Sequence, residues 1–242
     1  LFFSAGIMDD RESRRITSVT YGSQNFTFLR RDVSGSGNGS GMASEIWYLL
    51  NPNSGTNAVV VRQGTASRKV MGVVEYRGVT SVGSSNSVAG DVSSLVLTLQ
   101  TTSPRSVIAG FFAQKLDFWS GLFGVSFSTG SGMTSRWNRQ GYYNLEFIRG
   151  MEWDRTTVSS GYYNVTCTSN RTGYSALSAV ELKPSAPSVS SVVPAVGYTG
   201  GGNSVTITGA NFDNGCSVSF GGAAAASVTY INSGTLRVIT PP

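Results

Sequence analysis

Short stretches in which apolar and polar residues alternate recur along most of the chain. Examples are Ile16-Thr-Ser-Val-Thr-Tyr21, Asn25-Phe-Thr-Phe-Leu29 and Ser204-Val-Thr-Ile-Thr208. Because successive side chains of a strand point to opposite faces, a period of two predicts strands with one face in a core and the other in water. We find no run of ten or more residues with the period of an amphipathic helix. The pattern therefore predicts an all-β protein.

Other stretches are apolar at nearly every position. Leu1–Met8, Asn57–Val61 and Arg105–Ala113 predict buried strands. Further strands are expected at 45–50, 70–76, 95–99, 122–127, 145–148, 162–168 and 176–182. About ten to twelve strands, with no helix to connect parallel partners, favour a two-sheet jelly-roll sandwich for residues 1–184.

The segments between the strands have the composition of turns and linkers. Gly22-Ser23 predicts a tight hairpin turn, Asp9–Arg15 a charged loop, and the glycine-rich stretch 34–41 a flexible loop. Lys183-Pro-Ser-Ala-Pro-Ser188 has two prolines within five residues, which favours an extended, semi-rigid connection. We therefore predict two domains, 1–184 and 185–242.

The second domain carries several motifs of one family. A Val-x-Pro entry is followed by Gly200-Gly-Gly202, by Val205-Thr-Ile-Thr-Gly209, by Asn211-Phe212 and by a Phe220-Gly-Gly222 turn. In this respect the stretch 187–242 resembles an IPT/TIG domain, an immunoglobulin-like β-sandwich. The resemblance implies a spacer or binding module rather than an active site.

The first domain resembles another group. Ser18-Val-Thr-Tyr-Gly22, Glu45-Ile-Trp-Tyr-Leu-Leu-Asn-Pro52 and the closing strand Ala179-Val-Glu-Leu-Lys-Pro184 are similar to jelly-roll, concanavalin-like modules of secreted and viral surface proteins. The resemblance implies a location and an architecture more than an activity.

Composition narrows the classes of function. Charged residues make up 13% of the chain, about half the usual share, and the net charge is +5. The arginines at 11, 14, 15, 30 and 31 lack an aromatic-lined basic face, so we expect them to be solvated and expect no nucleic-acid partner. Histidine is absent, and Leu1–Met8 is too short to cross a bilayer and lacks the features of a signal peptide. We thus expect no membrane insertion.

Cysteines and carboxylates give few candidates for chemistry. Cys167 and Cys216 fall in different domains, so we expect two thiols, with a disulfide between the domains as the alternative. Glu146, with Glu152 and Asp154 near Trp153, comes closest to the carboxylate pair of a glycosidase, yet the arrangement does not favour an enzyme. We expect no cofactor, and calcium at Asp9-Asp10 or Asp213-Asn-Gly215 stays open as an alternative.

Aromatic and glycosylation positions complete the candidates. Exposed rings that could contact a ligand or partner are expected at Trp119, Trp137, Tyr142 and Tyr162. Asn-x-Ser/Thr sequons, which would carry glycans in a glycosylating secretory pathway, occur at Asn25, Asn38, Asn164 and Asn170.

The last residues, Thr240-Pro-Pro242, usually precede a further strand of an IPT/TIG domain. We expect the second domain to be one or two strands short, completed either by further chain or by a strand from a neighbouring subunit.

These patterns predict a non-catalytic extracellular structural protein. We expect a repeating subunit of a surface filament, surface layer or virion appendage that self-associates through sheet edges and aromatic patches. The alternative is a carbohydrate-binding adhesin, or an accessory module of a secreted polysaccharide-active enzyme, with a glycan as partner.

Overall fold

The computed structural model describes residues 1–116, 124–143 and 146–242 and contains two compact units, 1–184 and 185–242. Apart from one short 3-10 helix, Glu12–Arg14, all regular elements of the described residues are strands, and neighbouring strands pair antiparallel. The expected all-β class and sandwich architecture are confirmed.

Three sheets build the N-terminal unit. We name them A, B and C. Sheet A has the order β4 (Thr27–Ser34), β5 (Met42–Tyr48), β1 (Phe2–Ile7), β7 (Lys69–Val74). Sheet B has the order β3 (Gln24–Asn25), β2 (Ile16–Tyr21), β6 (Val59–Gln63). Sheet C has the order β10 (Phe127–Thr129), β13 (Gly161–Pro184), β9 (Val107–Leu116), β12 (Glu146–Thr156), β11 (Thr134–Tyr143), and β8 (Val79–Thr101) pairs with β13.

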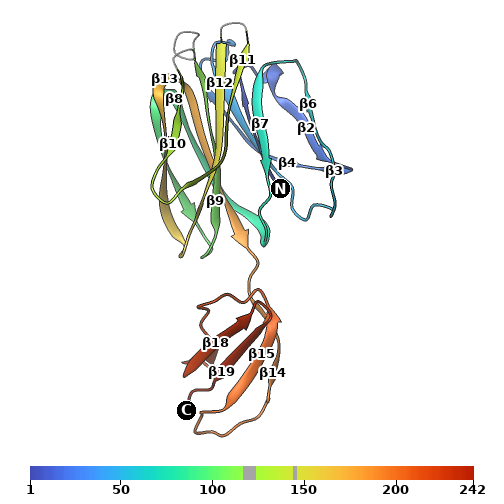
Figure 1. Cartoon of the computed structure of the whole chain (residues 1–242), viewed down its shortest axis with the longest axis vertical. Helices are drawn as coiled ribbons and strands as arrows, with labels where there is room; N and C mark the ends of the chain where they lie inside the picture. Colours follow the sequence, from blue (N-terminus) through green and yellow to red (C-terminus); the bar gives the residue numbers. More distant parts are fainter. Residues whose placement is uncertain (117–123, 144–145) are drawn as a thin grey trace. The chain divides into compact units, whose positions relative to one another are not determined.

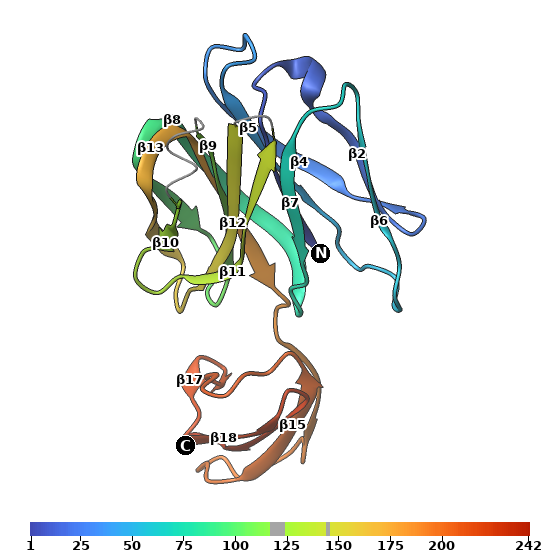
Figure 2. The same ribbon diagram turned by 45° about the horizontal axis from the view of Figure 1, so that its top comes forward.

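The expectation of two sheets in this unit is too simple, because the sheets stack as layers (Figures 1 and 2). Phe3 and Trp47 of sheet A pack with Ile16 of sheet B, and Phe2 and Phe111 belong to the core between sheets A and C. The central strands β1, β5 and β9 are consequently buried on both faces, which explains the nearly continuous apolar runs of β1 and β9. In β5, Ser44 and Glu45 are buried among apolar residues.

Strands β8 and β13 form a long ribbon that bends over a third core. Leu177 and Val165 lie in different halves of β13 yet share one cluster with Trp153 and Leu97. The pairing shifts between Thr168 and Gly173, which marks the bend. Sheet C therefore encloses a core of its own. The two halves of the β8–β13 ribbon, on either side of the bend, both contribute side chains to it.

Several local predictions need correction. The segment 34–41 is not a free loop, because Gly37 and Gly39 donate their backbone N–H groups to the Asp10 carboxylate. The valines of β6 are half-exposed at the edge of sheet B rather than buried. The expected strands at 122–127 and 145–148 lie partly outside the described residues. The hairpin around Gly22-Ser23 forms as predicted, with Tyr21 paired to Gln24.

The C-terminal unit has one four-stranded sheet, in the order β14 (Ser188–Val193), β15 (Ser204–Ala210), β19 (Thr235–Ile239), β18 (Ser227–Asn232), and a two-stranded sheet of β16 (Ser219–Phe220) and β17 (Ala223–Ala224). Alternating residues of β15 and β19 point into a small core. Its fully buried members are Val205, Ile207, Phe212, Leu236 and Val238.

Candidate functional site

The acidic residues of β12 are not arranged as a glycosidase pair. Glu152 lies six positions after Glu146 on the strand, which is about 20 Å, whereas the two carboxylates of a glycosidase lie within about 9.5 Å. Glu146 forms an ion pair with Lys115, with Nζ and Oε1 3.2 Å apart. Asp154 is closer to Glu152, but it is buried and bound to the Arg136 guanidinium. These contacts assign the carboxylates to the scaffold.

Glu152 is sealed between sheets A and C. Its Oε2 accepts hydrogen bonds from Ser4 Oγ at 2.9 Å and from Trp137 Nε1 at 2.8 Å, and no water reaches it. Its Oε1 has no hydrogen-bond partner among the described residues. Burial raises the pKa of Glu152 to about 8, because the charged form loses its hydration. A carboxyl group here joins two layers rather than facing a substrate.

The sequence predicts Trp137 to be an exposed residue near a loop. In the structure it is instead a half-buried residue of β11. Its ring lies 5.6 Å from the ring of Phe111 and covers the backbone of Gly72 in β7. A Cβ atom at Gly72 would approach this ring to 2.3 Å, so only glycine fits there. Trp137 thus closes the seam between sheets A and C, and its indole N–H is bound by Glu152.

The tyrosines are placed as expected from the alternation, whereas Trp119 lies outside the described residues. Tyr162 is 74% exposed, and its neighbour Tyr163 packs partly into the core of sheet C. Tyr142 is 58% exposed, and its ring stacks at 4.8 Å on that of Phe147. Tyr142 and Tyr162 thus remain candidates for contact with a partner.

The candidate calcium ligands have other partners. Asp9 forms ion pairs with Arg11 and Arg14, and the hydrogen bond from Arg11 lowers its pKa. Asp10 accepts the N–H groups of the glycine-rich loop, and Asp213 begins a turn closed by Cys216. No group of three or more His, Cys, Asp or Glu side chains is placed to hold a metal ion in the ranges that the structure describes.

All four sequon asparagines are exposed, at Asn25, Asn38, Asn164 and Asn170. Asn38 accepts hydrogen bonds from Ser40, and Asn170 contacts the segment 124–126, whereas Asn164 stands on the open face of β13. Both Cys167 and Cys216 are free thiols, and Cys167 is buried.

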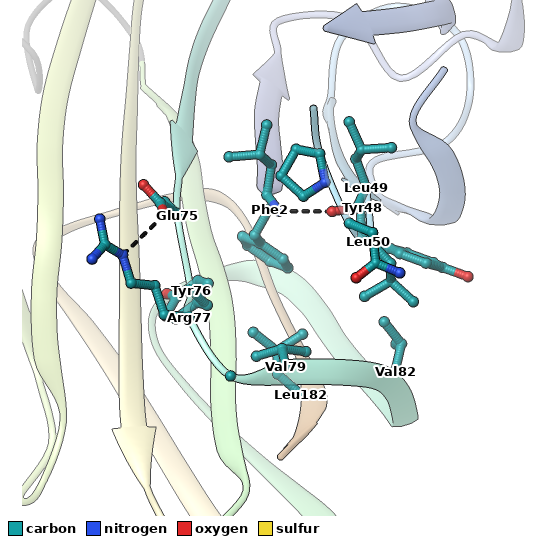
Figure 3. Close-up of a pocket in the computed structure, with 14 residues that line it drawn as sticks. Phe2, Tyr48, Leu49, Leu50, Glu75, Tyr76, Arg77, Val79, Val82 and Leu182 are labelled. Atoms are coloured by element: carbon teal, nitrogen blue, oxygen red, sulfur yellow. Dashed lines mark hydrogen bonds and ion pairs between the residues drawn. The ribbon is translucent and has the colours of Figure 1, made fainter. Parts of the chain in front are cut away.

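One apolar pocket, of about 280 Å³, opens in the N-terminal unit. Figure 3 shows Phe2 directed toward Val79 and Leu182, with Glu75 and Arg77 paired to each other. The pocket is just smaller than the roughly 300 Å³ at which sites for drug-sized ligands begin. Its size and lining suit a small apolar group.

The C-terminal sheet ends in two strands without charge. β14 and β18 each pair with one neighbour only, and neither contains a charged residue or a proline. The unit as a whole holds two charged residues, Asp213 and Arg237, out of 18 basic and 13 acidic residues in the chain. Unpaired backbone groups along such strands can accept another strand.

The sequence did not reveal which side chains bind the buried carboxylates or the glycine-rich loop. Ser4 and Arg136 gave no signal, because a lone serine in an apolar run and an arginine in a polar stretch have no motif. The glycines at 37 and 39 were recognised, but nothing in their spacing pointed to Asp10.

Comparisons with known proteins agree with the description of the C-terminal unit. Residues 187–242 match the family model of the IPT/TIG domain, so the resemblance noted for this stretch is confirmed. Such domains are non-catalytic, immunoglobulin-like modules that occur in extracellular and surface proteins. The jelly-roll resemblance of the N-terminal unit is not supported by a family match.

No curated protein and no solved structure matches the chain. In the described parts of the structure, no helix has the length and apolar character needed to cross a membrane.

Proposed function

We propose that this chain is a non-catalytic structural protein of a cell or virion surface that assembles by pairing the sheet edges of its C-terminal unit. A repeating subunit of a filament, surface layer or virion appendage is the form of assembly that this mode of pairing favours. The bare edges of β14 and β18 carry the proposal.

Edge strands are normally protected against pairing with other chains by lysines, prolines, bulges or a covering segment. Of these four kinds of protection, the two strands have only a bulge near one end. It lies between Val189 and Ser191 in β14 and between Tyr230 and Asn232 in β18. The stretches Ser191–Val193 and Ser227–Tyr230 keep regular pairing. Because the N–H and C=O groups of successive residues point to opposite sides of a strand, about every second residue of each stretch offers unpaired backbone groups to a second copy.

The low charge of the unit removes a second obstacle. Like charges on approaching copies repel one another and keep proteins apart. Because Asp213 and Arg237 have opposite signs and are the unit's only charged side chains, two copies meet little repulsion. The non-catalytic part of the proposal is supported by the contacts of Glu146, Glu152 and Asp154, which are held by the scaffold.

Lysines introduced at the edges test this proposal. In the double variant Ser191→Lys/Ser227→Lys, both exposed edge positions gain a charge, and we expect assembly to require at least about tenfold higher concentration. The control Thr208→Lys adds one lysine to the exposed face of the central strand β15, where no copy can pair, and each edge lysine is also measured alone so that the added charge matches. Sedimentation velocity over a concentration series, with electron microscopy of the products, gives the readout.

Two results would overturn the proposal. One is a wild-type chain that stays monomeric across the series, and the other is an edge variant that assembles as readily as the Thr208→Lys control.

A further inference from the structure

The outward-facing residues of two paired strand segments form an uncharged polar surface. We call Val96, Thr98 and Gln100 of β8 with Tyr162, Asn164 and Thr166 of β13 the outer face. The strands pair Gln100 with Tyr162, Thr98 with Asn164 and Val96 with Thr166. The intervening leucines at 95, 97 and 99 are buried, so the side chains of the outer face all point away from the core. They form a grid of two by three, with strands about 4.8 Å apart.

No charged residue lies in the segments 94–101 and 161–168. Solvated faces of strands usually carry lysine or glutamate, and here the whole of β8 contains one charged residue, Asp91. The six side chains themselves give no attraction to phosphate groups or to basic peptides. The guanidinium of Arg155 contacts this strand but is held by the backbone oxygen of Asn164, at 3.2 Å, and by the ring of Tyr163. The chemistry of the outer face suits a neutral, polar ligand.

Most hydrogen-bonding groups of the outer face are uncommitted. Thr98 Oγ1 donates to Asn164 Oδ1 at 2.7 Å, which fixes the amide and turns its Nδ2 donor outward. The side-chain amide of Gln100 and the hydroxyls of Thr166 and Tyr162 have no hydrogen-bond partner among the described residues.

Polar side chains between the sheets behave differently. There, Ser178 Oγ donates to Asp32 and contacts Ser44 Oγ at 3.1 Å, so the polar atoms are used within the protein. The outer face therefore presents donors and acceptors in fixed positions that the fold itself does not need.

An exposed aromatic ring stands at one corner of this grid. Tyr162 is 74% exposed, and Val96, which is 57% exposed, adds apolar surface at the other end. A pyranose ring has an apolar face of C–H groups, which packs on an aromatic ring, and a rim of hydroxyls, which bond to amides and hydroxyls.

We propose that the outer face binds a neutral glycan chain, with Tyr162 stacking on one sugar ring and Thr98, Gln100, Asn164 and Thr166 bonding to hydroxyls. This role is independent of assembly through the C-terminal edges, because it uses another unit. A protein partner is less suited to the outer face, since five of its six residues are polar or carry a polar group.

The test uses the whole chain, produced in a host that does not glycosylate Asn164, because a glycan attached there would cover the outer face. Isothermal titration with cellohexaose, xylohexaose, mannohexaose and chitohexaose supplies four neutral probes. We expect at least one to bind, and we expect Tyr162→Ala to weaken it by about tenfold or more. Tyr162→Phe should retain most of the affinity, since the ring remains.

Tyr142→Ala is the matched control, because it removes a similarly exposed ring from β11 and leaves the outer face intact. Circular dichroism of each variant confirms that the fold is kept. The proposal is overturned if no neutral probe binds, if Tyr142→Ala loses binding while Tyr162→Ala keeps it, or if only sulfated glycans bind in a salt-dependent manner.

Discussion

The two units treat the edges of their sheets in opposite ways. In the N-terminal unit the edge strands β4, β6, β7 and β11 each contain a charged residue, at Arg30, Arg62, Lys69 and Arg136. Along β8, the side chains of Ser84 and Asn86 cover the backbone carbonyls of Gln100 and Thr98 instead. In the C-terminal unit, β14 and β18 contain none. Since charge is a common protection against edge pairing, the difference supports the proposal that association uses the C-terminal unit.

The interiors of the two units also differ, in the number of polar side chains that they bury. The N-terminal unit buries six carboxylates, at Asp9, Asp10, Glu45, Glu152, Asp154 and Glu181, and each accepts hydrogen bonds. The C-terminal unit buries five apolar residues and no polar side chain. Buried polar contacts fix how layers align, so the N-terminal unit is built as a rigid body, whereas the smaller unit depends on a thin core.

The largest effect should come from the core enclosed by sheet C. Trp153 is fully buried there, and Trp153→Ala should lower the free energy of unfolding of the N-terminal unit by about 3–5 kcal/mol. Tyr142→Ala, at an exposed ring, should cost less than about 1 kcal/mol. Urea unfolding followed by tryptophan fluorescence measures both, and similar losses in the two variants would contradict the layered core.

The next effect depends on pH. Burial raises the pKa of Glu152 from an ordinary value of 4.5 to about 8, so the folded chain holds a proton that the unfolded chain releases. The unfolding free energy should therefore fall as the pH rises from about 4.5 to about 8 and then level off. The groups around it are Ser4, Trp137, Asp154, Arg136 and Tyr76.

Glu152→Gln removes this ionisation. Burial also raises the pKa of Glu45, so the informative quantity is the difference between wild type and variant at each pH. We expect the variant to gain stability relative to wild type as the pH rises from 5 to 9 in urea unfolding. A difference that does not change with pH would show that Glu152 ionises normally.

A smaller loss is expected at the glycine-rich loop. Asp10→Ala leaves the N–H groups of Gly37 and Gly39 without their acceptor, which should cost about 1–3 kcal/mol and speed proteolysis within 34–41. Ser36→Ala, at an exposed position of the same loop, serves as the control. Equal cleavage rates in the two variants would mean that Asp10 does not hold the loop.

The smallest effect should occur on the outer face. Thr98→Ala should change the unfolding free energy by no more than about 0.5 kcal/mol, because the residue is exposed and its hydrogen bond lies in water. It should nevertheless weaken binding of the neutral oligosaccharide, which calorimetric titration detects. A large loss of stability would reassign Thr98 to the scaffold.

Much of the fold could be predicted where alternation or continuous apolar runs mark a strand. β1, β2 and β9 were recognised in this way, as were the hairpin at Gly22-Ser23 and the IPT/TIG domain. β11 was missed because Thr134–Tyr143 is polar on both faces, and its strand state comes from pairing with β12. Long-range pairing is not encoded in local propensity.

The candidate site was harder to predict. Tyr162 was identified from the alternation of adjacent tyrosines, but Trp137 was placed in a loop because its acceptor, Glu152, lies on another strand. The local patterns also did not predict that sheets A, B and C stack as three layers. A strand buried on both faces looks the same whether it lies in a two-layer or a three-layer stack.

Hydrogen–deuterium exchange of the whole chain at low and high concentration tests assembly through the C-terminal edges most directly. We predict that those backbone amides of Ser191–Val193 and Ser227–Tyr230 that point away from the sheet exchange more slowly as the concentration rises, while the outward amides of the charged edge β6 exchange at an unchanged rate. Assembly that leaves β14 and β18 unprotected, and slows exchange in the N-terminal unit instead, would contradict the account.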